Sequence, residues 1–283
     1  MLRHNGVLVA TLNAGEVYYR GDWGGYSDMT GAHITANKLV AFFAQSSGTA
    51  IPLSGIGDIL FQQLAPVNTW SKRFFVPVTL PGTDYVRIVV SQNNTSISQI
   101  GGTIRTDAGG QPTLTHLQAG QFVELEILLS NNGCFIDADK PVGFCYFMQS
   151  RSNYNLLGSC SQVWIPSIEQ SVSKILTVPF DFSIYGAHYA IVCAPTTTRD
   201  NTMVSIGGAP PVPLSGDIWH NHTAGMSFYN FLLTNFATSY LFSNPAKIIV
   251  LGYGLYNPSV AYKASYYYLA GSAMRVRSRV LCK

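Results

Sequence analysis

Three groups of residues are of the types that could do chemistry. Glu124 and Glu126 come nearest to the paired carboxylates that a glycosidase places on either side of its scissile bond. On a strand these glutamates, two positions apart, point to the same face of the sheet. An approximate alternation of polar and apolar residues from Gln121 to Leu128 already accounts for both, so we interpret them as the solvated face of a strand.

The other two groups are short polar segments. Asp137 and Asp139 occupy what we interpret as a tight turn, and neither position is acidic in an earlier copy of the segment, so we expect a structural role. Asp217, His220 and His222 include an H-x-H pattern that could hold a metal ion in a suitable geometry. For this segment we favour an exposed polar loop over a metal site.

Enzyme motifs are absent from the sequence. The chain contains no G-x-S-x-G elbow, no G-x-G-x-x-G and no P-loop. Its cysteines are odd in number and lack C-x-x-C spacing, which argues against metal clusters and thioredoxin-like chemistry; they are Cys134, Cys145, Cys160, Cys193 and Cys282. The first two flank the expected turn and could be bridged, although free buried cysteine is the commoner state. The sequence therefore predicts a protein that is not an enzyme and uses no metal or other cofactor.

Tyrosines are unusually frequent towards the C-terminus. In loops they could stack on sugar rings or form a protein-binding patch, because tyrosine supplies contact area at low entropy cost. In strands, aromatic side chains usually serve core and cross-strand packing, so both interpretations stay open. The candidate binding surface consists of Tyr253, Tyr256, Tyr262, Tyr266 and Tyr268.

The elements that must position these residues recur along the chain. Leu117–Gln149 has the pattern of a strand, a polar tight turn and a more deeply buried strand. Its opening is echoed at Leu12–Glu16 and more faintly at His222–Gly225, so the glycines of successive copies are about 105 residues apart. The expected turn recurs as well, at Ile34–Val40 and at Phe242–Ile248.

A period of about 105 residues has the size of one β-sandwich domain. Frequent turn signals and scarce helical stretches also favour an all-β protein. We therefore expect tandem β-sandwich-like repeats, two whole units preceded by a half unit. The expected divisions are the C-terminal half of a unit in residues 1–57, whole units in 58–150 and 151–271, and a basic tail in 272–283. Because a half unit cannot bury its own apolar face, residues 1–50 should pack on, or pair strands with, the first whole unit.

Charge and hydropathy limit the partners. No apolar run approaches the roughly 20 residues that cross a bilayer, so we expect no membrane insertion. The net charge is only +3, and we interpret Arg275, Arg277 and Arg279 as a frayed tail, not a nucleic-acid patch. Met1–Val7 does not form a convincing signal peptide, and a start partway through a unit suggests a truncated chain.

Ten motifs stand in the order in which a known family carries them. They are Asp28–Gly31, Ala36–Val40, Gln63–Trp70, Phe74–Pro77, Val86–Val89, Asn93–Thr95, Leu117–Gln121, Ile136–Val142, Gly252–Gly254 and Ala264–Gly271. Together they resemble the N-terminal domain family of the IgGFc-binding protein, in a bacterial, Bacteroidetes-like form that lacks the family's front part. Two positions depart from that pattern: Gly57 replaces a cysteine, and Leu39 stands where proline is usual.

The resemblance implies a non-catalytic, secreted or cell-surface, adhesin-like module that recognises host glycoprotein, mucin or matrix. Its partner would be an unidentified protein or glycoprotein, and flanking domains of a longer chain are expected. Immunoglobulin binding belongs to the name-giving member and does not transfer. The alternatives are a purely structural spacer repeat of a larger surface protein and, less favoured, a carbohydrate-active enzyme.

Overall fold

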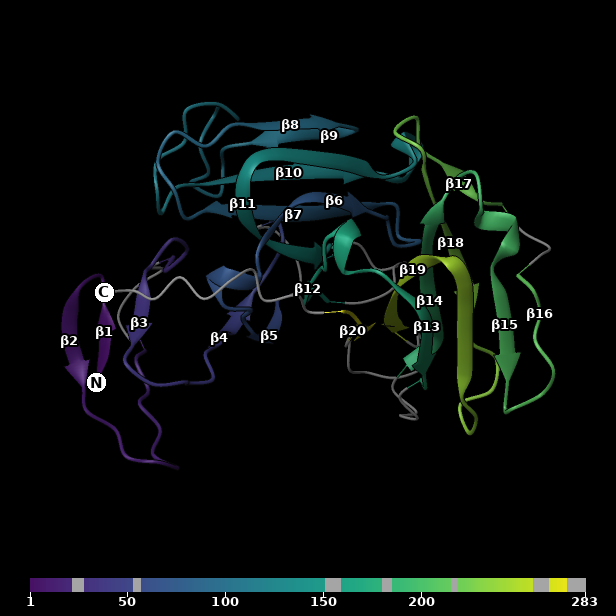
Figure 1. Cartoon of the computed structure of the whole chain (residues 1–283), viewed down its shortest axis with the longest axis horizontal. Helices are drawn as coiled ribbons and strands as arrows, with labels where there is room; N and C mark the ends of the chain where they lie inside the picture. The colour runs from purple at the N-terminus through teal and green to yellow at the C-terminus, as the bar shows by residue number, and fades with distance from the viewer. Residues whose placement is uncertain are drawn as a thin grey trace.

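The computed structural model describes residues 1–21, 28–52, 57–150, 159–179, 185–214, 218–256 and 265–273. These residues form an all-β protein, which confirms the predicted fold class (Figure 1). The number of repeat units and the divisions between them remain predictions. Helical structure in the described ranges is confined to the 3-10 turns η1 (Val67–Thr69), η2 (Leu129–Asn131), η3 (Ile168–Gln170) and η4 (Arg199–Asn201).

The strands fall into an N-terminal segment and two larger bodies. The N-terminal segment contains β1 (Leu2–His4), β2 (Val7–Ala10), β3 (Ile34–Ala36) and β4 (Phe43–Thr49), and β5 (Asp58–Gln63) follows it. The first body contains β6 (Ser71–Val76), β7 (Thr83–Val90), β8 (Ile97–Ile100), β9 (Gly102–Arg105), β10 (Phe122–Leu128), β11 (Cys134–Met148) and β12 (Ser161–Trp164). The second body contains β13 (Val172–Thr177), β14 (Tyr185–Pro195), β15 (Met203–Ile206), β16 (Val212–Pro213), β17 (His220–Asn221), β18 (Met226–Leu232), β19 (Tyr240–Tyr256) and β20 (Tyr266–Gly271).

One long strand organises the first body. The first half of β11 pairs with β6 and β8, whereas its second half pairs with β7 and β12. The strand therefore joins two parts of one continuous seven-stranded sheet, with its bend between Ala138 and Val142. The predicted tight turn at Ile136–Val142 is wrong, because the polar residues bend a continuous strand and do not reverse the chain.

The second body repeats this arrangement. The first half of β19 pairs with β13 and β15, and its second half pairs with β14 and β20. Its bend carries Lys247 at a φ of 72°, in the left-handed region. Both bodies are thus built around one long strand whose two halves have different neighbours.

The two bodies share one hydrophobic core. Successive residues of β14 point to opposite faces, so Ala190 and Val192 enter the second body's own core while Ile191 and Cys193 enter the core shared with the first. Across that interface the ring of Phe75 lies 6.3 Å from that of Phe228. The sheet formed by β14, β18 and β19 is therefore buried on both faces.

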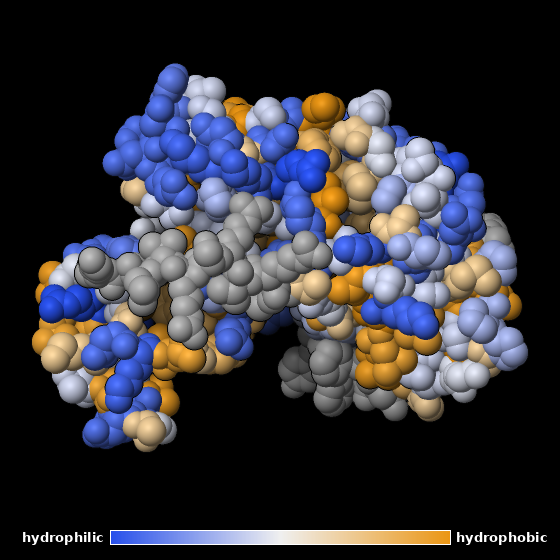
Figure 2. Space-filling view, viewed as in Figure 1, coloured by the Kyte–Doolittle hydropathy of each residue, from blue (hydrophilic) through white to orange (hydrophobic). Residues whose placement is uncertain are grey.

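The N-terminal segment is attached more loosely. β1 pairs with β2 and β3, and β4 pairs with β5, whose Leu60 packs against Tyr85 and Phe147 of the first body. Residues 43–49 therefore pair strands with residues 58–63, as predicted for the half unit. Figure 1 shows β1 to β3 at the end of the molecule away from the second body, and Figure 2 shows apolar side chains on the surface there.

Candidate functional site

Two tyrosines of β20 lie across two glycines of β19. The antiparallel register pairs Tyr266 with Gly254 and Tyr268 with Gly252. A Cβ atom at Gly252 would come within 2.2 Å of the Tyr268 ring, and one at Gly254 within 2.1 Å of the Tyr266 ring. The rings therefore fill the space that the missing side chains leave, and they stack with centroids 5.9 Å apart. We call Tyr266 and Tyr268 the tyrosine ladder.

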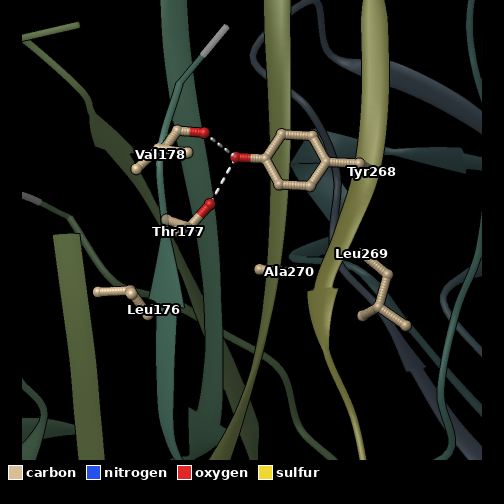
Figure 3. A pocket seen from close by; sticks show the side chains of 6 residues that line it. All are labelled: Leu176, Thr177, Val178, Tyr268, Leu269 and Ala270. Carbon is tan, nitrogen blue, oxygen red and sulfur yellow. Dashed lines mark hydrogen bonds between the residues drawn. The ribbon is translucent and has the colours of Figure 1, made fainter. Parts of the chain in front are cut away.

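The Tyr268 end of the ladder borders an open hollow. Its volume is about 330 Å³, and it is lined by Leu176, Thr177, Val178, Tyr268, Leu269 and Ala270 (Figure 3). The Tyr268 hydroxyl lies 2.5 Å from Thr177 Oγ1 and donates to the Val178 carbonyl oxygen at 2.9 Å. Leu176 and Val178 are 59% and 55% exposed. Figure 3 shows the Thr177 side chain turned toward the Tyr268 hydroxyl and the Leu176 and Val178 side chains turned away from the ring. The hollow thus has a ring of fixed orientation at its edge and exposed aliphatic groups on the opposite side of the strand.

The Tyr266 end of the ladder contacts a buried histidine. His188 Nδ1 lies 2.5 Å from the Tyr266 hydroxyl, and the His188 ring lies 4.5 Å from that of Phe236. Phe236 is 39% exposed, so it extends the aromatic surface beyond the ladder. No sequence signal marked His188 or Phe236 as part of this surface, because β14 and the segment before β19 meet β20 only in the folded chain.

Of the tyrosines in the predicted binding surface, the structure places Tyr266 and Tyr268 together and buries Tyr253. Tyr253 is fully buried in the shared core, donates to Asn230 Oδ1 at 2.9 Å and accepts from the Leu80 amide at 3.3 Å. It therefore cannot contact a ligand at the surface, because its side chain leaves β19 on the face that meets the first body. The Tyr256 side chain and the whole of Tyr262 lie outside the described residues.

The paired carboxylates do not form a fully solvated face, which corrects the sequence interpretation. Glu124 is buried and accepts from Arg87 Nη2 at 3.0 Å, and Glu126 accepts from the Tyr85 hydroxyl at 2.9 Å. The Arg87 guanidinium also lies 4.6 Å from the centre of the Phe122 ring. Buried Glu124 and half-buried Glu126 therefore belong to a polar layer on β7 and β10.

The N-terminal segment covers that layer through Arg87. Arg87 Nη1 donates to Asp28 Oδ2 at 2.7 Å and to Thr30 Oγ1 at 2.9 Å. Burial raises the pKa of Asp28, but the Thr30 hydrogen bonds and the Arg87 charge outweigh it and lower that pKa overall. A Cβ atom at Gly31 would lie only 1.9 Å from the Gly120 carbonyl oxygen, so glycine is required for this contact. We call Asp28, Arg87 and Glu124 the Arg87 junction.

The aspartates of the β11 bend are structural, as expected. Asp139 accepts from the Ser96 amide at 2.9 Å through Oδ1 and donates its own amide to the Ser96 carbonyl oxygen at the same distance. Lys140 donates to the Asn93 carbonyl oxygen at 2.7 Å. The bend therefore holds the connection between β7 and β8, while Asp137 pairs with Ser98 in the β11–β8 ladder.

The histidine pair lies at the interface between the bodies. His222 Nε2 is 3.1 Å from the Ile100 carbonyl oxygen, and its ring lies 5.7 Å from that of Phe75. His220 stacks on Phe228 at 4.6 Å. Burial lowers the pKa of both imidazoles. The expected exposed loop is wrong for these two residues, because they pack against the first body; Asp217 lies outside the described residues.

A buried carboxylate at the start of β7 was missed by the sequence analysis. Asp84 is fully buried and accepts from the Thr79 amide at 2.6 Å, from the Thr79 hydroxyl at 2.8 Å and from the Tyr146 hydroxyl at 2.5 Å. Burial raises the pKa of Asp84 to about 6, and these hydrogen bonds offset only part of that shift. Because its side chain is fully buried and hydrogen-bonded within the protein, we assign Asp84 a structural role.

The cysteines within the described ranges carry free thiols. Burial raises the pKa of Cys134 and of Cys145 to about 12, which makes both thiols poor nucleophiles. Cys282 lies outside the described residues, as do Arg275, Arg277 and Arg279. The structure groups no three metal-ligating side chains within the part of the chain that it describes.

Comparison with known proteins identifies one family. The sequence model described as IgGFc binding protein matches residues 2–254, which is most of the chain. No curated protein and no solved structure matches. The matched family is a binding family and not a known enzyme class. None of the helices in the described ranges has the length and apolar character that crossing a membrane requires.

Proposed function

Because the chain belongs to the IgGFc binding protein family, we propose that it is a non-catalytic binding module that works outside the cell, secreted or held at a cell surface. Its ligand is a protein or glycoprotein, with host mucin or matrix as the class we favour. The family match supports binding as the kind of function, and the pairing of buried Glu124 with Arg87 supports a structural role for that carboxylate.

The observation that carries the proposed binding surface is the hollow beside the tyrosine ladder. Leu176 and Val178 are more than half exposed although they flank Thr177, which is buried. The Tyr268 hydroxyl is held by Thr177 and Val178, so its ring needs little further ordering when a ligand binds. A fixed ring beside exposed aliphatic groups suits the apolar face of a sugar or an apolar side chain of a protein.

An array of purified mucins and matrix glycoproteins tests the proposal. The double variant L176S/V178S changes only exposed side chains, and L232S is its matched control because Leu232 is 46% exposed elsewhere on the second body. We expect the double variant to lose at least about tenfold in affinity for any glycoprotein that the unaltered chain binds, and the control to lose none. Equal binding by both variants would place the ligand elsewhere.

The alternative is a spacer repeat that presents other domains. It is favoured by the core that the two bodies share, because one continuous core makes the pair a rigid unit. Absence of binding to every glycoprotein on the array by the unaltered chain would favour the spacer over the binding module.

A further inference from the structure

The N-terminal segment carries the β11 motif with half of its pairing partners. In β11 and in β19, each half of the strand lies between two neighbours. β3 and β4 correspond to those halves, because Ala36–Val40 matches Ala138–Val142 in sequence. Within the described residues β3 pairs with β1 alone and β4 with β5 alone. In the part of the chain that the structure describes, no second strand pairs with either, so each shows one edge without a strand neighbour.

In the first and second bodies, the two strands at the positions that are empty beside β3 and β4 follow one another in the chain. β1 and β2 form a hairpin beside β3, as β15 and β16 do beside the first half of β19. β5 stands beside β4 as β12 and β20 stand beside the second halves of β11 and β19. The unfilled positions are those of β6 and β7, or of β13 and β14. One continuous segment with two strands would fill both.

Residues 16–20 of the N-terminal segment also correspond to a strand that pairs with β7 in the first body. In the first body the Leu117–Gln121 motif leads into β10, which pairs with β7. The copy of this motif at Leu12–Glu16 leads into residues 16–20, which form no strand. There the Val17 side chain is 88% exposed. A counterpart of β7 would pair with this segment as β7 pairs with β10.

Side chains near β3 and β4 are also less buried than their counterparts in β11. Val142 and Phe144 are fully buried, whereas their counterparts Val40 and Phe42 are 53% and 40% exposed. Phe144 stacks on Phe74 of β6 with ring centroids 4.6 Å apart. The strand that would cover Phe42 is therefore the counterpart of β6, the first of the two absent strands.

We propose that the N-terminal segment accepts a pair of consecutive antiparallel strands of the kind that residues 71–90 form, supplied from outside residues 1–283. A second copy of this chain cannot donate its own pairs, because β6 and β7 are buried in the shared core and β14 is buried on both faces. Strand order places the donor on the N-terminal side of β1, because β7 precedes β8 and β14 precedes β15 in the chain.

A graft tests the proposal. Residues 71–96 are copied and joined directly to Leu2, so that the connection between β7 and β8 leads into β1. The control carries the same graft with proline in place of the copied Val86 and Ile88, which removes strand pairing. Amide hydrogen exchange is followed at residues 16–20, 34–36 and 43–49 in the unaltered, grafted and control chains.

We expect exchange at these residues to slow at least about tenfold in the grafted chain and to stay unchanged in the control. Fluorescence of a dye that binds exposed apolar surface should fall in the grafted chain alone, because Val40 and Phe42 become covered. Unchanged exchange in the grafted chain, or equal slowing in both grafted chains, would overturn the proposal. Slowing by a free peptide of residues 71–90 without slowing by the graft would overturn the N-terminal placement of the donor.

Discussion

Residues 134–148 and residues 34–49 contain related motifs in different surroundings. The first stretch forms one strand between four partners. The second forms two shorter strands, each with one partner among the described residues. Alternation and motif are similar in both, so neither decides whether the side chains are buried. The difference teaches that neighbouring strands, and not the motif, bury this element.

The largest expected difference in stability is between variants of Phe144 and of its counterpart Phe42. F144A should lower the free energy of unfolding by about 4 kcal/mol, because it removes a fully buried ring that stacks on Phe74. F42A should cost less than about 1 kcal/mol, because that ring is 40% exposed. Denaturant unfolding measures both changes, and similar losses would show that the two environments are equivalent.

The Arg87 junction joins residues 28–31 of the N-terminal segment to the first body. R87M should cost about 3 kcal/mol, because Glu124 stays buried without its cation. It should also speed proteolysis near residue 28. R73M is the matched control, since the side chains of Arg73 and Glu169 are 52% and 31% exposed, more than those of Arg87 and Glu124, and loss of their pair should cost under about 1 kcal/mol. If the two variants lost equal stability, the junction would be an ordinary surface pair.

Asp84 lies at the start of β7, which pairs with the second half of β11. Among the described strands, none takes the corresponding place beside β4. The folded pKa of Asp84, about 6, lies above the value of about 4 for an unfolded aspartate, so the folded state binds the proton more tightly between those pH values. The stabilisation present below pH 4 is therefore lost as pH rises through 6, by at most about 3 kcal/mol.

The variant D84N has no proton to lose and isolates this contribution. The free energy of unfolding of the unaltered chain, relative to that of D84N, should decrease from pH 4 to pH 6 and then level off. Denaturant titrations at pH 4.5 and pH 7.5 measure it. A difference that does not change with pH would mean that Asp84 titrates normally.

The smallest expected difference in stability is between variants of Gly143 and of its counterpart Ala41, which differ by one methyl group. A Cβ atom at Gly143 would lie 2.5 Å from the Trp70 ring, whereas the corresponding residue of the N-terminal segment is already alanine, Ala41. G143A should cost about 1 to 2 kcal/mol through overpacking. A41G should cost less than about 1 kcal/mol. Thermal melts compare the two, and equal shifts would contradict the comparison.

Periodicity predicted local structure well and long-range structure poorly. The all-β class and the strand at Phe122–Leu128 followed from alternation along the chain. The bend in β11 did not, because a polar Asp-Lys-Pro segment also suits a chain reversal, and pairing with distant strands decides between them.

The candidate site was predictable only in part for the same reason. Composition marked the tyrosines, but alternate residues of β19 and β20 face either the first body or the surface. The sequence pattern alone does not say which residues face which side. Tyr253 therefore belongs to the core, while Tyr268 borders the hollow. The burial of Glu124 likewise depends on Arg87, which lies 37 positions away in the sequence.

Amide hydrogen exchange of the unaltered chain tests the central claim most directly. If pairing partners decide the state of this motif, amides of residues 43–49 should exchange at least about a hundredfold faster than those of residues 142–148. Equal protection of the two stretches would contradict the account, because it would mean that the N-terminal copy is as completely paired as the one in the first body.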